Sequence, residues 1–174
     1  MSLFEDAILP HVDAAHNLAR WLMRNDADAD DAVQDACLRA LRFFGGFRGG
    51  DGRVWLLAIV RNTCYSKLKR NRVNEYQTAF DENLHGHDSD ESGPEAALLR
   101  NIEAAALQRA VEGLPEEFRE VIVMRELEGL SYKEIADVIE VPIGTVMSRL
   151  ARARGRLQRA LKVEIPKPEV PEKR

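Results

Sequence analysis

Hydrophobic residues recur every three or four positions along most of this chain, and no stretch of any length alternates like a half-buried strand. The spacing predicts a series of amphipathic helices, whose apolar positions run from Phe4 to Leu22, Val33 to Phe44, Trp55 to Leu68, Leu98 to Leu114 and Phe118 to Leu127. Glycines between positions 45 and 52 interrupt the series, as do Gly113 and Pro115. The pattern therefore predicts an all-α fold.

The segment 130–161 predicts a helix-turn-helix. Ser131 precedes the first of its helices and Glu134 follows three positions later, which is the spacing of a reciprocal N-terminal cap. Pro142 is suited to the start of the second helix, because its fixed φ matches the first helical turn and no N–H is missed there. Glu140 stands in the turn between the two helices, and we expect some backbone strain at this residue.

The second of these helices has two distinct faces. Residues 142–163 contain six basic residues and no acidic one. One stripe is apolar, and a separate basic stripe lies roughly 120° away; the apolar positions are Val146, Leu150, Leu157 and Leu161, and the basic stripe is Thr145, Arg149, Arg152 and Arg156. A solvated amphipathic helix would show the same charges. The capped helix before it and the short connection containing proline favour a helix that docks in the major groove of DNA.

Charge is segregated along the chain. The net charge is −4 and the pI is about 5.6, which argues against bulk attraction to nucleic acid. Basic residues gather in 61–72 and in the last predicted helix, whereas acidic residues gather in 26–35 and 81–95. Because residues 73–97 lose apolar periodicity, we expect a flexible acidic linker there. The predicted organisation is thus a helical domain 1–72, a linker 73–97, a helical domain 98–162 with the helix-turn-helix, and a disordered tail 163–174.

Several function classes find no support in the sequence. Cys37 and Cys64 are too few for a disulfide framework or a four-cysteine zinc site, so we expect structural thiols. His85 and His87 lie in the acidic linker, where two solvated histidines are the simpler interpretation than a metal site. No apolar run reaches the length of a membrane span. With no catalytic constellation either, we expect a cytoplasmic protein that is not an enzyme, needs no cofactor and does not insert into membranes.

Three segments in this order resemble the sigma factors of bacterial RNA polymerase, in particular the two-domain extracytoplasmic-function subfamily of the sigma-70 family. DADADDAVQDACLRALRFF (26–44) looks like the helix that binds core polymerase. FRGGDGRVWLLAIVRNTCYSKLKR (47–70) looks like the element that melts and reads the −10 promoter sequence. Residues 114–157, which begin LPEEFREVIVMRELEGLSYKEIADVIE, look like the domain that reads the −35 sequence. The resemblance covers about residues 3–161.

The resemblance implies a promoter-specificity subunit whose partners are core RNA polymerase, promoter DNA and an inhibitory anti-sigma factor. The predicted core-polymerase contacts are Asp31, Gln34, Asp35 and Leu38. The predicted −10 contacts are Arg48, Arg53, Arg61, Asn62, Lys67, Lys69 and Arg70, with a base pocket in the loop 48–53. The predicted −35 contacts are Thr145, Ser148, Arg149, Arg152 and Arg156.

The chemistry of these residues agrees with those roles, although simpler interpretations stay open. Asp26 and Asp28 suit a helix N-terminus, but Asp35 lies two turns further on, where the helix dipole explains it poorly. Basic residues that follow phosphates would hold a melted strand. For Trp55, packing in the core is favoured over stacking on a base. Met147 replaces a lysine often found in the family, which removes one expected phosphate contact.

Two other functions remain as alternatives. An autonomous transcriptional regulator would bind operator DNA as a dimer, but no obvious dimerisation helix is present. An adaptor that binds only protein would show no salt-dependent binding to DNA.

Overall fold

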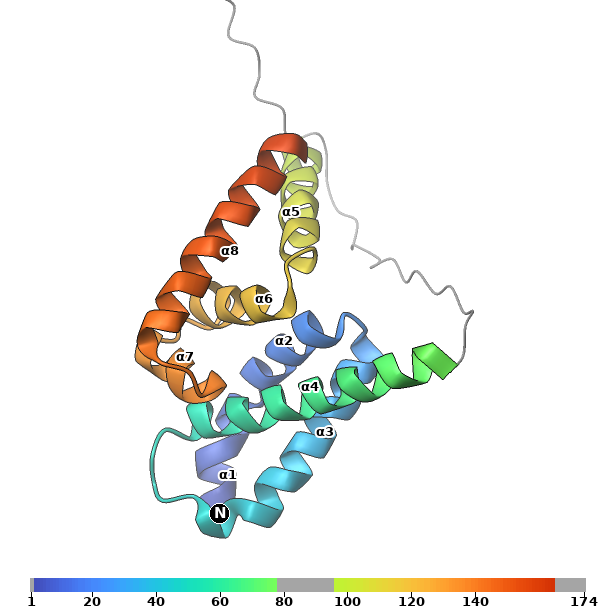
Figure 1. The fold of residues 1–174 in the computed structure, drawn as a ribbon. Coiled ribbons are helices and arrows are strands. Elements are labelled where there is room, and N and C mark those ends of the chain that lie inside the picture. Colours follow the sequence, from blue (N-terminus) through green and yellow to red (C-terminus); the bar gives the residue numbers. More distant parts are fainter. Residues whose placement is uncertain (1, 78–95, 165–174) are drawn as a thin grey trace, which may run out of the picture.

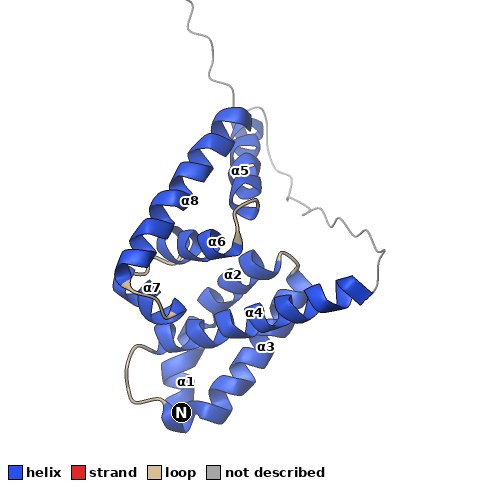
Figure 2. Ribbon diagram, in the orientation of Figure 1, coloured by secondary structure: helices blue, strands red, loops and turns tan. Residues whose placement is uncertain are grey.

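The computed structural model describes residues 2–77 and 96–164, and within these two ranges it contains helices and no strand (Figures 1 and 2). The expected linker and tail lie mostly outside the described residues, as do His85 and His87. The helices are α1 (Leu3–Ile8), α2 (Val12–Met23), α3 (Asp26–Phe43), α4 (Gly52–Gln77), α5 (Ala96–Glu112), α6 (Glu116–Ile122), α7 (Tyr132–Ile139) and α8 (Ile143–Glu164). Short turns η1 (Leu9–His11), η2 (Phe44–Gly46) and η3 (Val123–Leu127) join some of them.

The predicted first helix is in fact two helices. Pro10 lies in the 3-10 turn η1, between α1 and α2. Proline lacks the N–H that a continuous helix would need and its ring crowds the preceding turn, so the helix changes direction there. The periodicity from Phe4 to Leu22 was continuous across this break, which is why apolar spacing alone missed it.

Helix α3 begins at an asparagine cap and buries a face of small residues. The side chain of Asn25 accepts a hydrogen bond from the backbone N–H of Asp28 at 3.1 Å. Ala29, Ala32 and Val33 are buried, and so are Ala36 and Ala40. Leu41, which lies in the apolar pattern predicted from Val33 to Phe44, is instead 57% exposed. Small side chains let α2 and α4 approach α3 closely, and Leu41 falls outside that contact.

Helix α4 extends five residues beyond the predicted boundary at residue 72 and begins against α1. A side chain added at Gly52 would meet the carbonyl oxygen of Ala7 at 2.1 Å, so only glycine fits at this crossing. Gly52, which ends the loop of the predicted base pocket, therefore serves packing between α1 and α4. A side chain added at Gly49 or Gly50 of the same loop would meet no other atom within 4 Å.

The C-terminal helices follow the sequence pattern closely. Ser131 accepts a hydrogen bond from the N–H of Glu134, and Glu134 accepts one from the N–H of Ser131, each at 3.1 Å. Glu140 ends α7 in the left-handed conformation at φ 57°, as its place in the turn predicted. Pro142 immediately precedes α8, and Val146 and Leu150 are buried on its apolar face.

The cap predicts a measurable loss of stability. We expect Ser131→Ala to lower the free energy of unfolding by about 1 kcal/mol, since an N–H at the start of α7 loses its acceptor. The backbone hydrogen bond from Ser131 holds the pKa of Glu134 below its usual range. The stability contributed by Glu134 is therefore present at neutral pH and is lost as pH falls through that lowered pKa. Urea unfolding at pH 7 and at acid pH measures both effects; equal stability of variant and parent at pH 7 would contradict the cap.

The two groups of helices share one buried core. Helices α1–α4 form an N-terminal module and α5–α8 a C-terminal module, and α6 and α7 lie against α2 and α4 (Figure 1). Buried side chains of both modules belong to a single cluster, which includes Leu18 and Leu22 from one side and Phe118 and Val121 from the other. The described helices are thus arranged as two modules in contact.

Candidate functional site

The predicted core-polymerase contacts lie together on one face of α3. Asp31, Gln34 and Leu38 are exposed, and Asp35 is partly exposed. Lys67 of α4 donates to both carboxylates, with Nζ–Oδ2 distances of 2.8 Å to Asp31 and to Asp35. The hydrogen bond from Lys67 holds the pKa of Asp35 below its usual range, so this carboxylate is charged and fixed in place.

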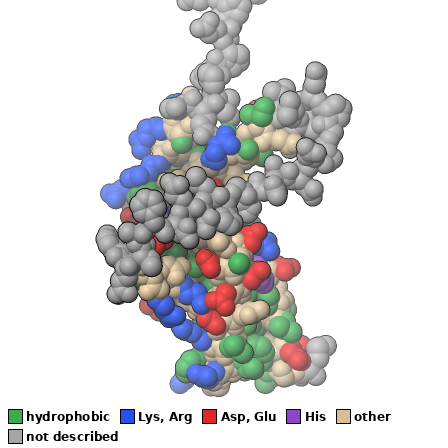
Figure 3. Space-filling view, turned by 90° about the vertical axis from the view of Figure 1, so that its right-hand side faces the viewer, with side chains coloured by type: hydrophobic (Ala, Val, Ile, Leu, Met, Phe, Trp, Pro, Cys, Tyr) green, Lys and Arg blue, Asp and Glu red, His purple; other side chains and the backbone are tan. Residues whose placement is uncertain are grey.

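An apolar groove adjoins these acids. It has a volume of about 450 Å³ and is lined by Phe4, Ile8, Leu9, Gln34, Cys37, Leu38 and Leu41. Leu9 and Leu41, which the sequence reasoning did not assign to a site, are 54% and 57% exposed there. On the face shown in Figure 3, acidic side chains gather over the lower half of the molecule, with hydrophobic side chains beside them. A partner that suits this surface would be basic and partly apolar.

The predicted −10 contacts are divided among several faces. Lys67 points to α3, as described above. Asn62, Lys69 and Arg70 are exposed on α4, and Arg48 is exposed in the loop before it. Arg53 and Arg61 point toward the C-terminal module instead. At 100° per residue Asn62 and Lys69 lie on the same face of α4. Of the predicted −10 contacts, these two could therefore bind the same DNA strand from one face of the helix.

Arg53 and Arg61 form hydrogen bonds with the C-terminal module. Arg53 donates to the carbonyl oxygen of Glu128 at 3.2 Å and to the carboxylate of Glu134 at 3.1 Å. Arg61 forms a bidentate pair with Glu120, at 2.7 Å from Nε and 3.2 Å from Nη2. In this arrangement neither guanidinium is available to a DNA strand.

Aromatic side chains surround the start of α4. Trp55 lies 5.2 Å from Phe47 and 6.2 Å from Phe44, centroid to centroid, and it is half-buried. Phe44 also meets Phe4 of α1 edge to face. The preference for packing over base stacking at Trp55 fits this cluster, which holds the loop 47–51 against α1.

Helix α8 carries all the predicted −35 contacts, and some of them face solvent whereas others face α6. Arg152 and Arg156 are exposed, and the Arg156 guanidinium lies 5.0 Å from the ring centre of Phe118. Ser148 is exposed and donates to the carbonyl oxygen of Thr145, which is half-buried. Arg149 turns toward α6, 3.9 Å from Glu117 and 4.0 Å from Glu120, with 23% of its side chain exposed.

Glu120 was not singled out by the sequence, although it is the most deeply buried charge near these residues. Its side chain is completely buried, and both Arg61 and Arg149 approach it. Burial raises the pKa of Glu120, and the hydrogen bonds from Arg61 oppose that rise. On a helical projection of α6, Glu120 lies on the side opposite the apolar residues Phe118 and Ile122. The spacing along this one helix therefore predicts an exposed glutamate.

The two cysteines differ in environment, which predicts different reactivity. Burial raises the pKa of both thiols, to about 12 for Cys64, which is fully buried; Cys37 lies at the groove and is only half-buried. Since thiolate is the reactive form, we expect iodoacetamide at pH 8 to label Cys37 first and Cys64 only after denaturation. Mass spectrometry of Cys37→Ser gives the check; rapid labelling of that variant under native conditions would contradict the buried position of Cys64.

Within residues 2–77 and 96–164, none of the helices combines the length and apolarity needed to cross a membrane.

Comparison with known families finds two matches that cover most of the chain. Residues 7–73 match sigma-70 region 2, and residues 104–162 match sigma-70 region 4. The first match falls on the N-terminal module and the second on the C-terminal module, in the order that the sequence motifs suggested.

Known relatives and solved structures agree with these matches. The ECF RNA polymerase sigma factor SigM of Mycobacterium tuberculosis is 40% identical over 161 residues, 91% of this chain and 76% of the relative. The ECF RNA polymerase sigma-E factor of Escherichia coli K12 is 37% identical over 80% of this chain and 78% of its own length. The sigma factor RpoE of Bartonella quintana, solved in complex with the anti-sigma factor NepR, superposes with a TM-score of 0.73 at 28% identity, over 93% of this chain and 98% of that one. The chain therefore belongs to the extracytoplasmic-function sigma factors of the sigma-70 family, which direct RNA polymerase in transcription initiation.

Proposed function

We propose that this chain binds bacterial core RNA polymerase through α3 and brings it to promoters that α8 and α4 select. The observation that carries the proposal is the α3 surface, where two carboxylates fixed by Lys67 adjoin an apolar groove. This combination suits a basic, partly apolar helix of a partner. The predicted contacts are Asp31, Gln34, Asp35 and Leu38, to which the groove adds Leu9 and Leu41.

The two DNA sites are assigned to separate modules. In the proposal α8 enters the major groove of the −35 element, with Arg149 and Arg152 at guanine edges and Thr145, Ser148 and Arg156 near the backbone. The −10 strand lies along α4, where Asn62, Lys69 and Arg70 are exposed, and Arg48 contributes from the preceding loop. Arg53 and Arg61 join them once they leave the C-terminal module.

Two modest DNA sites become effective when one polymerase holds both. The second contact is then intramolecular, and its effective concentration raises the total affinity well above that of either site. The chain supplies binding and no covalent step, and it works in the cytoplasm with the polymerase. An anti-sigma factor belongs to the proposal as well, because the structural relative from Bartonella quintana was solved with one.

Reconstituted transcription tests this function. Core polymerase with the purified chain should produce transcripts from a fragmented bacterial genome that core alone does not produce. Gel-shift assays with and without core separate the alternatives: binding to specific duplex DNA by the free chain, unchanged by core, would favour an autonomous regulator. Absence of any new transcript from folded protein would reject the proposal.

A further inference from the structure

Ile143 and Met147 form an apolar edge on the surface of α8, the helix that carries the predicted −35 contacts. Ile143 is 44% exposed and Met147 is 51% exposed. They lie four residues apart, so they are neighbours on one side of the helix. The buried residues Val146 and Leu150 lie on a different side, and neither residue of the apolar edge packs against the core cluster of the described residues. Packing within the described helices therefore gives no reason for apolar side chains at these two positions.

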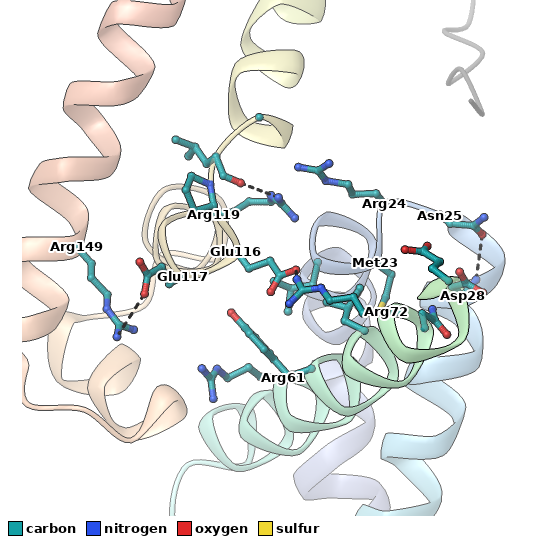
Figure 4. A pocket seen from close by; sticks show the side chains of 18 residues that line it. Met23, Arg24, Asn25, Asp28, Arg61, Arg72, Glu116, Glu117, Arg119 and Arg149 are labelled. Atoms are coloured by element: carbon teal, nitrogen blue, oxygen red, sulfur yellow. Dashed lines mark hydrogen bonds and ion pairs between the residues drawn. The ribbon is translucent and has the colours of Figure 1, made fainter. Parts of the chain in front are cut away.

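The apolar edge borders the surface on which several of the −35 contacts are exposed. At 100° per residue Ser148 lies between Met147 and Arg152, and the three side chains span roughly 140° of the helix surface. All three are exposed. Arg149 lies further round the helix, where it points toward Glu117 of α6 (Figure 4). The outward surface of α8 thus has an apolar flank at Met147 and a basic flank at Arg152.

A cation on the apolar side of α8 is already paired. Arg154 lies about two turns beyond Met147 on nearly the same side of the helix. Its Nη2 is 2.9 Å from the carboxylate of Glu126 in η3. Because Arg154 is held in this pair, a partner that approaches Met147 meets an apolar surface.

The major groove of DNA offers one apolar group to such a surface. Every base pair presents hydrogen-bond donors or acceptors there, whereas the C5-methyl group of thymine is the only apolar substituent. A methionine side chain suits this group, because it is unbranched and adapts to irregular gaps. A polar side chain at the same place would lose hydration against the methyl group and gain no hydrogen bond from it.

From these observations we infer that Met147 reads the methyl group of a thymine in the −35 element, with Ile143 beside it. The inference rests on the proposed docking of α8 in the major groove of that element. Promoter choice then has an apolar component on one flank of α8, next to the arginine contacts with guanine on the other. A lysine at position 147 would instead contact a phosphate, which carries no sequence information.

Uracil differs from thymine only in lacking the C5-methyl group, so replacing thymine by uracil tests the contact directly. Holoenzyme made with core polymerase selects from promoter duplexes with a randomised −35 element, synthesised once with thymine and once with uracil. At one position we expect the preference for thymine in the first pool to exceed that for uracil in the second by about three- to fivefold, the factor for burying one methyl group. Preferences for guanine should be equal in both pools, because those contacts do not involve the methyl group.

Variants at Met147 show whether this residue makes the contact. Met147→Leu keeps an apolar side chain of similar volume and should keep the preference for thymine over uracil. Met147→Gln has a polar side chain of similar length and should select equally from both pools. Met147→Lys should also lose the preference, and its new phosphate contact should steepen the slope of log affinity against log salt by about one. Because Met147 is exposed, all three variants should fold.

The outcomes separate this inference from the proposed function. Guanine preferences without any difference between the two pools would overturn the inference and leave the proposed function standing. A Met147→Gln variant that still prefers thymine over uracil as the parent does would also overturn it, since another residue would then contact the methyl group. No preference at any −35 position in either pool would reject the proposed docking of α8, and the inference with it.

Discussion

Asp35→Arg should weaken binding to core RNA polymerase by about tenfold or more, since charge reversal in a complementary interface removes an attraction and adds a repulsion. Asp35 is partly exposed, and its Oδ2 lies 2.8 Å from Nζ of Lys67. Its neighbours Gln34 and Leu38 on α3 line the apolar groove. The new guanidinium would repel Lys67 as well as a basic partner. Biolayer interferometry with purified core, in the absence of DNA, measures the affinity directly.

The control for Asp35→Arg is Asp137→Arg. Asp137 is exposed on α7 of the C-terminal module, so the substitution changes the net charge by the same amount on a different surface. We expect it to leave the affinity for core close to that of the parent. Equal losses for both variants would mean that overall charge, and not the α3 surface, governs association.

Lys67→Gln separates two roles for one residue. The sequence assigned Lys67 to the −10 strand, but the structure pairs it with Asp31 and Asp35. If Lys67 positions these carboxylates, we expect Lys67→Gln to lower the affinity for core by a few-fold, with little effect on binding to −10 oligonucleotides. The same binding assay with both ligands decides the question; a loss confined to the oligonucleotide would return Lys67 to the DNA site.

Local features were the ones that the sequence predicted well. The cap of Ser131 and Glu134 and the left-handed turn at Glu140 depend on residues within one or two turns of each other. The buried stripe of Val146 and Leu150 likewise follows from helical spacing alone. Such features need no knowledge of the other module, because short-range geometry determines them.

Features that depend on contacts between distant helices could not be predicted in the same way. Glu120 lies on the polar side of α6, and it is completely buried where Arg61 of α4 and Arg149 of α8 approach it. Leu41 has the spacing of a core residue, but none of the described helices covers it, and it lines a groove instead. In both cases packing against other helices determines whether the side chain is exposed. The periodicity along a single helix carries no information about that packing.

The grouping of the −10 residues shows the same limit. A run of basic residues between Arg61 and Arg72 suggested one DNA surface, yet each turn of a helix distributes neighbours around its axis. Arg61 and Arg72 contact the C-terminal module, Lys67 contacts α3, and Lys69 is exposed. A helical projection of α4 places these side chains on different faces of the helix. Only the structure shows which of these faces contacts the C-terminal module.

Arg149→Ala should change which promoters the holoenzyme selects. A bidentate contact from arginine to guanine discriminates by about 1–3 kcal/mol, so promoters with that guanine should lose most of their advantage over those without it. Arg159→Ala removes the same charge from an exposed position further along α8 and should weaken all promoters alike. Competitive transcription from a pool of promoter variants, read by sequencing, measures both effects.

Arg149→Lys sharpens this result, because lysine keeps the charge but lacks the planar fork that binds two acceptors at once. If Arg149 reads a base, the lysine variant should lose promoter choice nearly as much as the alanine variant. Within the C-terminal module the Arg149 guanidinium lies 3.9 Å from the carboxylate of Glu117, so it must leave that carboxylate to reach a base. Glu117→Gln should then raise the affinity of the C-terminal module for duplex DNA without altering promoter preference. A uniform loss across the pool for Arg149→Ala, with full activity for Arg149→Lys, would reduce Arg149 to a phosphate contact.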